Sequence, residues 1–98
     1  MSVHVIWLYS SKGSPIAFLY SGAVFSATGK FLGCLEGKYV VNGAYVGELY
    51  GRDRFVRQQF RPLIAQHYEH ENFELKMSPP EPVEAIVLPS DFQDLGPL

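Results

Sequence analysis

The sequence predicts a mainly β fold built from short hairpin-like repeats. Two observations lead to this prediction. Glycines recur at Gly13, Gly29 and Gly43, and apolar residues gather between glycines in runs of about five or six, the length of an ordinary strand. The chain has 98 residues, of which 47% are hydrophobic and 14% aromatic. This size and composition predict one folded domain with a thin core.

The repeat becomes visible when the chain is aligned on these three glycines. Aromatic residues stand four positions before each glycine, at Tyr9, Phe25 and Tyr39. Leucines stand six positions after each, at Leu19, Leu35 and Leu49, and a further glycine closes each unit at Gly22, Gly37 and Gly51. A fixed period with so many matching columns predicts a strand–turn–strand unit, with Lys12-Gly13, Thr28-Gly29 and Asn42-Gly43 in the turns.

Alternation along the second strand of each unit predicts which residues face a common centre. This face comprises Pro15, Ala17, Leu19, Phe31, Gly33, Leu35, Tyr45, Gly47 and Leu49. We expect the leucines to form a central layer, and the small residue before each leucine to let neighbouring backbones approach closely. The opposite face keeps Ile16, Leu32 and Val46 and then varies through Phe18, Cys34, Glu48, Tyr20, Glu36 and Tyr50. We expect that variable edge to lie outside.

A fourth unit begins after Gly51, because Phe55 stands 12 residues past Gly43 as Phe25 stands 12 past Gly13, but no glycine turn follows it. The array therefore has about three and a half to four units. An unclosed sheet exposes unpaired backbone groups that attract another strand. Ser2–Leu8, a later segment or a second chain would close it.

The first 57 residues also resemble a known family. The resemblance is carried by Tyr-Ser-Ser-Lys-Gly at 9–13, Phe-Ser-Ala-Thr-Gly-Lys-Phe-Leu-Gly at 25–33 and Tyr-Val-Gly-Glu-Leu-Tyr-Gly at 45–51. These segments look like the four-fold β-flower domain of uncharacterised bacterial proteins. The resemblance implies hairpin repeats closed around a pseudo-four-fold axis, and it brings no functional motif. The third unit is shorter than the others, and the last 40 or so residues lie outside the family pattern.

The sequence divides into a hairpin-repeat domain at 1–60 and a C-terminal extension at 61–98, packed on the repeat domain or exchanged between chains. Apolar spacing predicts one short helix at 61–70. Alternation predicts a strand at 73–77, and the composition of 78–82 predicts an extended Pro-rich spacer. Val83–Leu88 is apolar enough for a strand, and Pro89–Leu98 is expected to be a loose tail.

Charge and composition exclude several classes of protein. Residues 1–61 carry a net charge of +4 and residues 62–98 a net charge of −6, so the two parts attract each other or present opposite faces to partners. No apolar run is long enough for a membrane span, and no positive charge precedes the apolar run Val3–Tyr9 as a secretory signal requires. A lone cysteine, Cys34, suits a reducing compartment. We therefore expect a cytoplasmic protein.

Few residues are candidates for a chemical or binding role. His67 and His70 have a spacing that can place two metal ligands on one helical face, although a solvated helix end is the simpler interpretation. Arg52, Arg54 and Arg57 could bind anions, but the acidic balance of the chain argues against nucleic acid. Tyr20 and Tyr50 are aromatic residues at outer positions. The sequence has no nucleophile–base pattern and no phosphate-binding glycine loop, so we expect neither an enzyme nor a cofactor.

The function that best fits these features is a non-enzymatic structural or protein-interaction module. Its partner would be a protein, and self-association into a homo-oligomer would proceed through the unpaired edge or through exchange of the segment Phe73–Leu88. The alternative is a small-ligand or metal-binding domain that uses Tyr20 and Tyr50, or His67 and His70.

Overall fold

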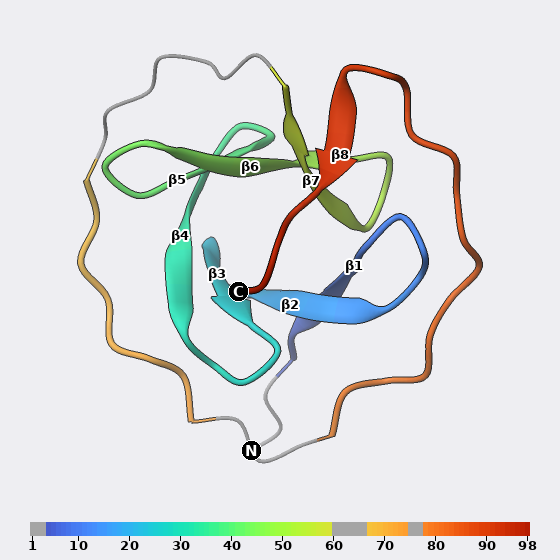
Figure 1. Ribbon diagram of the computed structural model, residues 1–98. Coiled ribbons are helices and arrows are strands. Elements are labelled where there is room, and N and C mark those ends of the chain that lie inside the picture. The colour runs from blue at the N-terminus through green and yellow to red at the C-terminus, as the bar shows by residue number, and fades with distance from the viewer. Residues whose placement is uncertain (1–3, 60–66, 75–77) are drawn as a thin grey trace.

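A computed structural model describes residues 4–59, 67–74 and 78–98 of the chain. These residues form a single sheet in which every strand pairs with the next one along the chain (Figure 1). The strands are β1 Ile6–Tyr9, β2 Pro15–Tyr20, β3 Ala23–Ser26, β4 Phe31–Glu36, β5 Tyr39–Val41, β6 Tyr45–Tyr50, β7 Arg54–Gln58 and β8 Phe92–Asp94. The prediction of a mainly β fold is confirmed.

The first seven strands form a closed barrel, because β1 also pairs with β7. This closing pair is parallel and joins Tyr9 to Arg54, and the backbone N–H of Tyr9 donates to the carbonyl of Asp53 at 2.8 Å. Of the three closures considered from the sequence, the N-terminal strand is the one that closes the barrel. β8 is an additional strand that pairs antiparallel with β7.

The hairpin turns lie where the sequence predicts them. Gly13, Gly29 and Gly43 adopt φ angles of +93°, +96° and +75° between the strands of the first three hairpins. Glycine adopts this left-handed conformation at little cost because it has no Cβ. The turn prediction is confirmed.

Each of the first three hairpins contains a β-bulge at the same position, which the sequence analysis missed. In the first, Leu8 faces Ala17 but the next residue, Tyr9, faces Pro15, so Ile16 is an extra residue on β2. Leu32 and Val46 are the extra residues in the second and third hairpins. A bulge breaks the alternation of side chains along a strand. The three residues consequently pack against the central core and not on the opposite face.

The third hairpin also has a shorter turn, and this changes the repeat register. The paired strands enclose residues 10–14 and 26–30 in the first two hairpins but 42–44 in the third. Val41 and not Tyr39 is therefore the equivalent of Phe25, and the aromatic column expected at Tyr9, Phe25 and Tyr39 is wrong. The structurally equivalent inward residues are Leu8, Val24 and Val40.

The core lies along the barrel interior, as the leucine column predicts. Leu19, Leu35 and Leu49 all pack against one buried cluster, which consists of Leu8, Ala17, Val24, Val40 and Phe55. Gly33 and Gly47 permit close strand contact, because a Cβ at either position would lie 2.7 Å from the carbonyl oxygen of the neighbouring strand. Such an overpacked substitution costs about 1–3 kcal/mol.

The C-terminal extension differs most from the prediction. No helix is found among the described residues, and of the predicted helix at 61–70 only 67–70 are described, without helical structure. Phe73 and Glu74 are not in a strand, and 75–77 lie outside the described residues. Val83–Leu88 forms no strand either, whereas β8 occupies the segment expected to be a loose tail. There Leu95 packs against the same core as the bulge residues.

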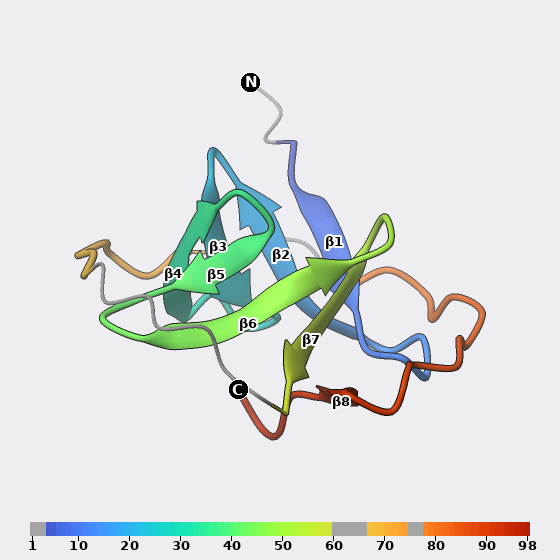
Figure 2. The ribbon, with the colours of Figure 1, turned by 90° about the horizontal axis from the view of Figure 1, so that it is seen from above.

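The described residues 67–74 and 78–88, which we call the belt, lie around the outside of the barrel (Figure 1). In the side view they flank the barrel on opposite sides, and β8 lies beside β7 (Figure 2). No helix in the described part of the chain is long and apolar enough to cross a membrane.

Candidate interaction site

The belt is held by the turns of the first three hairpins, which it meets in reverse order. Tyr68 donates its backbone N–H to the side-chain oxygen of Asn42 at 3.3 Å. Further along, the Phe73 N–H donates to the Gly29 carbonyl at 2.7 Å and the Val83 N–H to the Gly13 carbonyl at 2.9 Å. The repeated turns thus bind an extended chain largely through backbone groups, a mode that places few demands on sequence.

Two of these contacts require glycine. A Cβ on Gly29 would lie 2.0 Å from the carbonyl oxygen of Phe73, and a Cβ on Gly13 would lie 1.9 Å from that of Val83. Both distances are far inside van der Waals contact. Gly22 has the same kind of positive φ, at +82°, but a Cβ there would meet nothing within 4 Å. Glycine is therefore needed at positions 13 and 29 for two reasons, the conformation of the turn and the close approach of the belt.

An aromatic pocket receives the side chain of Phe73. Its ring centroid lies 5.2 Å from that of Phe18, 5.3 Å from that of Tyr20 and 5.4 Å from that of Phe25. These are the edge-on and tilted geometries that aromatic pairs favour. Phe18 and Phe25 are fully buried. The expectation that Phe18 lies at an outside edge is therefore wrong, because the belt covers it.

Neighbouring belt residues extend this contact. The His70 ring stacks on Phe31 at a centroid distance of 5.2 Å and meets the edge of Phe25 at 5.4 Å. The side-chain oxygen of Asn72 accepts the backbone N–H of Phe31 at 2.9 Å. His70, Asn72 and Phe73 together contact the second hairpin through stacking, a hydrogen bond and apolar burial.

A second feature lies at the turn between β6 and β7. A hollow of about 370 Å³ is lined by Tyr50, Gly51, Arg52, Asp53, Arg54, Ile86 and Val87. It gathers three of the residues that the sequence analysis named as interaction candidates. Tyr50 packs on Phe92 with a centroid distance of 5.2 Å. Arg52 is exposed, whereas Arg54 is only 7% exposed.

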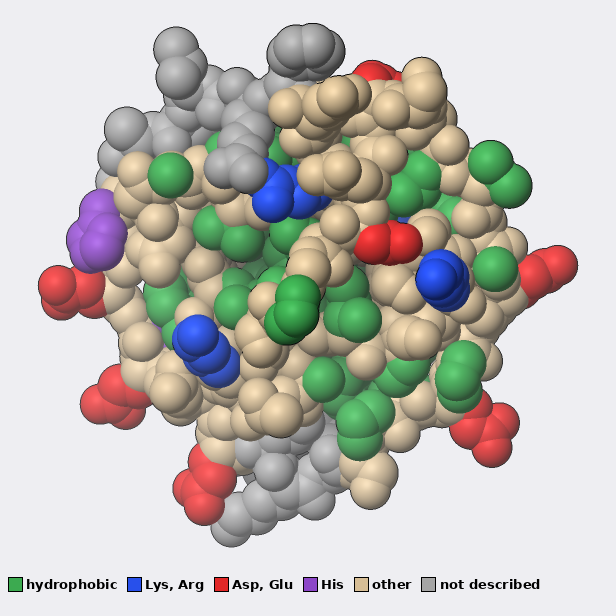
Figure 3. Space-filling model, in the orientation of Figure 1, with side chains coloured by type: hydrophobic (Ala, Val, Ile, Leu, Met, Phe, Trp, Pro, Cys, Tyr) green, Lys and Arg blue, Asp and Glu red, His purple; other side chains and the backbone are tan. Residues whose placement is uncertain are grey.

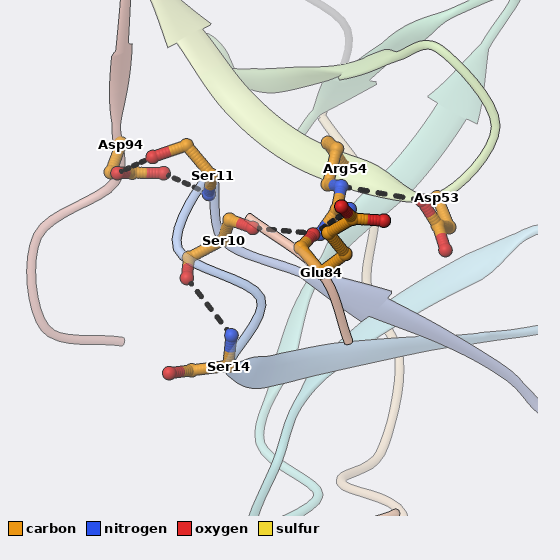
Figure 4. Close-up of polar contacts among 7 residues, drawn as sticks. All are labelled: Ser10, Ser11, Ser14, Asp53, Arg54, Glu84 and Asp94. Carbon is orange, nitrogen blue, oxygen red and sulfur yellow. Dashed lines mark hydrogen bonds and ion pairs between the residues drawn. The ribbon is translucent and has the colours of Figure 1, made fainter. Parts of the chain in front are cut away.

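Arg54 is fixed by groups from three parts of the chain (Figure 4). Its Nη1 donates to the Ser10 carbonyl at 3.2 Å and its Nη2 to the Glu84 carbonyl at 2.5 Å. Its Nε lies 3.5 Å from a carboxylate oxygen of Asp53. The side chain of Arg54 therefore connects β7 to the first turn and to the belt.

A separate contact ties β8 to the first turn (Figure 4). The Asp94 carboxylate accepts the backbone N–H of Ser11 at 2.7 Å and the Ser11 hydroxyl at 2.5 Å. A carboxylate that accepts two hydrogen bonds forms a strong, charge-assisted contact. It fixes the short C-terminal strand at the edge of β7.

Glu48 forms a buried polar network on the outer side of β6. Its side chain is 1% exposed, so the position expected at the variable outer edge is buried. Its Oε1 accepts the Tyr45 hydroxyl at 2.8 Å and the Gln58 side-chain amide at 2.5 Å, and Lys38 Nζ lies 3.6 Å from Oε2. The Tyr45 hydroxyl in turn accepts the Gln58 backbone N–H at 2.9 Å.

The Tyr45 hydroxyl has a perturbed acidity because of this environment. Burial is the main cause that raises its pKa above the ordinary tyrosine value. The hydrogen bond to Glu48 and the negative charges of Glu48 and Tyr39 raise the pKa further, while the bond from Gln58 lowers it. The phenol therefore stays neutral over the physiological range and supports Glu48 as a donor.

The remaining candidates do not form a site. His67 lies at the Gly43 turn and His70 on Phe31, and the described residues contain no group of three His, Cys, Asp or Glu that could hold a metal ion. Arg57 does not line the hollow around Arg52, and its Nε is buried without a hydrogen-bond partner in the described part of the chain. Tyr20 belongs to the aromatic pocket. Sequence alternation missed Phe73 as a functional residue because its partners lie on β2 and β3, far earlier in the chain.

On the face seen in Figure 1, the described acidic side chains are spread around the rim and the described basic ones lie apart from one another. Hydrophobic side chains group near its centre (Figure 3).

No protein-family model matches the chain, and no curated protein or solved structure matches it either. The interpretation of the site therefore rests on its own geometry.

Proposed function

We propose that this chain is a non-enzymatic interaction module whose hairpin turns bind an extended polypeptide segment. The observation that carries the proposal is the contact of the belt with the second hairpin and the neighbouring strand β2. There a backbone hydrogen bond to Gly29 is combined with insertion of Phe73 into an aromatic pocket. Main-chain hydrogen bonds that supply affinity and a side-chain pocket that supplies specificity are the two parts of peptide recognition by extended segments.

We further propose that two copies self-associate by exchanging the segment 73–88, together with the β8 strand that follows it. Every contact that the belt makes within one chain can be made identically with a second copy, which is the basis of domain swapping. The connection favours this exchange, because 33 residues separate Gln58 at the end of β7 from Phe92 at the start of β8. A connection of that length between paired strands is far longer than a hairpin needs.

Sedimentation equilibrium over a range of about 1 μM to 1 mM, a span set by ordinary dimer affinities, tests the self-association. We expect the weight-average mass to rise toward that of a dimer. A strict monomer over the whole range contradicts this part of the proposal.

A disulfide trap distinguishes exchange from pairing of strand edges. Ser11 and Asp94 are in direct contact, so cysteines at both positions, in a Cys34→Ser background, are placed to form a disulfide. Oxidation at high concentration gives covalent dimers if β8 is exchanged. Dimers that contain only intrachain disulfides would instead indicate pairing along β1, which contacts β7 at one residue pair.

The hollow around Arg52 favours a second candidate function, the binding of a small anionic ligand. Arg52, which is exposed, lines a space of about 370 Å³ together with Tyr50, whereas the guanidinium of Arg54 is already bonded to Ser10 and Glu84. Guanidinium groups bind carboxylates and phosphates in a fork-like geometry. A thermal-shift screen of small carboxylates and phosphates tests this: a stabilising ligand should lose its effect on Arg52→Met. No shift from any anion contradicts it.

We also propose that the four strand pairs β1–β2, β3–β4, β5–β6 and β7–β8 are related by a pseudo-four-fold axis, as the resemblance to the four-fold β-flower domain implies. Support comes from Leu95, which packs on the core beside the three bulge residues Ile16, Leu32 and Val46. An experimental structure in which the fourth pair does not superpose on the other three after rotation about one axis would contradict this.

A further inference from the structure

We propose that the second hairpin, together with the neighbouring strand β2, recognises a specific sequence, an Asn-Phe pair preceded by a histidine two residues before the asparagine. The occupant in trans is the segment 70–73 of a second copy of this chain, so the exchanged part begins at His70 and continues through the segment 73–88. This inference rests on the proposed interaction function and names the partner of the site.

The apolar part of the site selects phenylalanine. The walls are the rings of Phe18, Tyr20 and Phe25, with centroids between 5.2 and 5.4 Å from that of Phe73. Phe18 also packs on Trp7, with a distance of 5.3 Å between the two ring centroids. Trp7 thereby supports the Phe18 wall of the pocket. Smaller apolar residues would leave part of this space empty and forfeit contacts with the rings.

The polar part of the site selects asparagine. Phe31 presents a backbone N–H that the Asn72 side-chain oxygen accepts, while the adjacent Phe73 N–H donates to Gly29. An occupant without a side-chain acceptor at this position loses this hydrogen bond. Because the bond is exposed to solvent, its loss weakens binding by no more than the net strength of one hydrogen bond.

Variation among the repeats places this specificity at one turn. The Gly13 turn accepts Val83 and Ile86 through backbone bonds, and no aromatic contact is found there among the described residues. Only the second hairpin has phenylalanines on both sides of its turn, Phe25 and Phe31. The two rings meet edge-on, and His70 stacks on Phe31 and meets Phe25 edge-on. The variable outer positions of the repeat therefore make one of three similar turns selective.

The pocket needs an occupant. Phe18 and Phe25 are fully buried, and removal of the belt would expose both rings together with Trp7 and Phe31, which pack against them. An exposed apolar patch of this kind promotes association. A released belt is thus replaced by an equivalent segment, and another copy of the chain carries one.

A labelled peptide spanning residues 67–74 tests the site directly, by fluorescence anisotropy with the full chain. Phe73→Ala empties the pocket, so this variant should bind the peptide, whereas the wild-type chain should bind it at least ten-fold more weakly. The peptide with Phe73→Ala should lose at least ten-fold in affinity, and the peptide with Asn72→Ala should lose affinity by a smaller factor. Equal affinity for all three peptides, or no binding of any of them, overturns the recognition proposal.

Two further measurements keep the result interpretable. In the Phe73→Ala background, Gly29→Ala should abolish peptide binding while Gly22→Ala should leave it unchanged, because only the first would place a Cβ against the peptide. If Phe73→Ala does not fold, hydrogen exchange on the Asn72→Ala chain replaces it. The Phe31 amide should then exchange at least ten-fold faster, while the Leu35 amide, bonded to Gly22, should not change; an unchanged Phe31 amide contradicts the proposal.

These outcomes are separate from those of the sedimentation experiment. Specific peptide binding by a chain that stays monomeric supports recognition and refutes exchange. Dimers with an interchain disulfide but without peptide selectivity support exchange and refute recognition.

Discussion

At the scale of single residues, glycines with the same backbone conformation have different tasks. Gly13 and Gly37 both have positive φ, at +93° and +63°, but only Gly13 lies against the belt. Alanine in the left-handed region costs about 1–2 kcal/mol at either position. At Gly13 it would also displace Val83, whose carbonyl oxygen would lie 1.9 Å from the new Cβ.

We therefore predict that Gly13→Ala destabilises the chain more than Gly37→Ala does. The difference should be about 1–3 kcal/mol, the usual cost of overpacking. Urea unfolding of both variants measures it, and Gly37→Ala serves as the control for backbone strain. Equal losses would mean that the belt does not rest on the Gly13 turn.

The buried pair of Tyr45 and Glu48 makes stability depend on alkaline pH. The folded-state pKa of Tyr45 lies above the unfolded value of 10.0, so above pH 10 the unfolded chain loses a proton that the folded chain keeps. The contribution of Tyr45 is therefore complete below pH 10 and is lost as the pH rises, at up to about 1.4 kcal/mol per pH unit.

Tyr45→Phe tests this linkage. It removes a donor to Glu48 and an acceptor of the Gln58 N–H, which should cost about 1–3 kcal/mol at neutral pH. Chemical denaturation between pH 7 and 11.5 should show that this cost shrinks above about pH 10. A cost that is the same at every pH would contradict the raised pKa.

At the scale of elements, β8 is held by few contacts and should detach first. It pairs with β7 over three residue pairs, and Asp94 joins it to Ser11. We predict that Asp94→Ala frees β8 and the chain end without unfolding the barrel. The loss of two charge-assisted bonds should cost about 1.5–3 kcal/mol.

Hydrogen exchange measures this local opening. The Gln59 amide, which donates to the Asp91 carbonyl beside β8, should exchange faster in Asp94→Ala, while the Leu49 amide, which donates to Lys38, should keep its protection. Ser11→Ala is the matched variant and should give a smaller effect, because the backbone N–H of Ser11 still reaches the carboxylate. Equal acceleration of both amides would mean that β8 unfolds only with the barrel.

Several elements could be predicted from the sequence because their causes are local. The turns at Gly13 and Gly29 follow from the conformational freedom of glycine, and the leucine column follows from alternation along a strand. The bulges could not be predicted in this way. An extra residue such as Leu32 is apolar and also continues the run, so the sequence gives no sign that pairing skips it.

The misplaced elements have non-local causes. The third turn is shorter than the others, and an alignment on its glycine alone shifts Tyr39 into the place of Val41. β8 was missed because the segment around Gln93 does not alternate between apolar and polar residues. Its pairing partner, Arg57, lies 36 positions earlier in the chain. Likewise, the burial of Phe18 depends on a belt residue, Phe73, from the opposite end of the sequence.

At the scale of the whole molecule, closure depends on a small number of long-range ties. Every other strand pair joins neighbours along the chain, and all of these except β7–β8 enclose short loops and therefore form easily. The β1–β7 pair joins strands at the two ends of the meander through Tyr9 and Arg54. The side chain of Arg54 adds bonds to the first turn and to the belt.

Arg54→Met should therefore destabilise the whole chain by about 2–4 kcal/mol, because it leaves the Ser10 and Glu84 carbonyls without this donor. Arg54→Lys should recover only part of the loss, since an ammonium group cannot donate in the fork geometry. Arg52→Met, in the same turn but exposed, is the control and should change stability by no more than about 0.5 kcal/mol. Urea unfolding measures these changes in stability. The unfolding is followed by the fluorescence of Trp7, the single tryptophan, which lies on β1 and packs on Phe18. If both arginine-to-methionine variants unfold at the same urea concentration, barrel closure does not depend on the Arg54 tie.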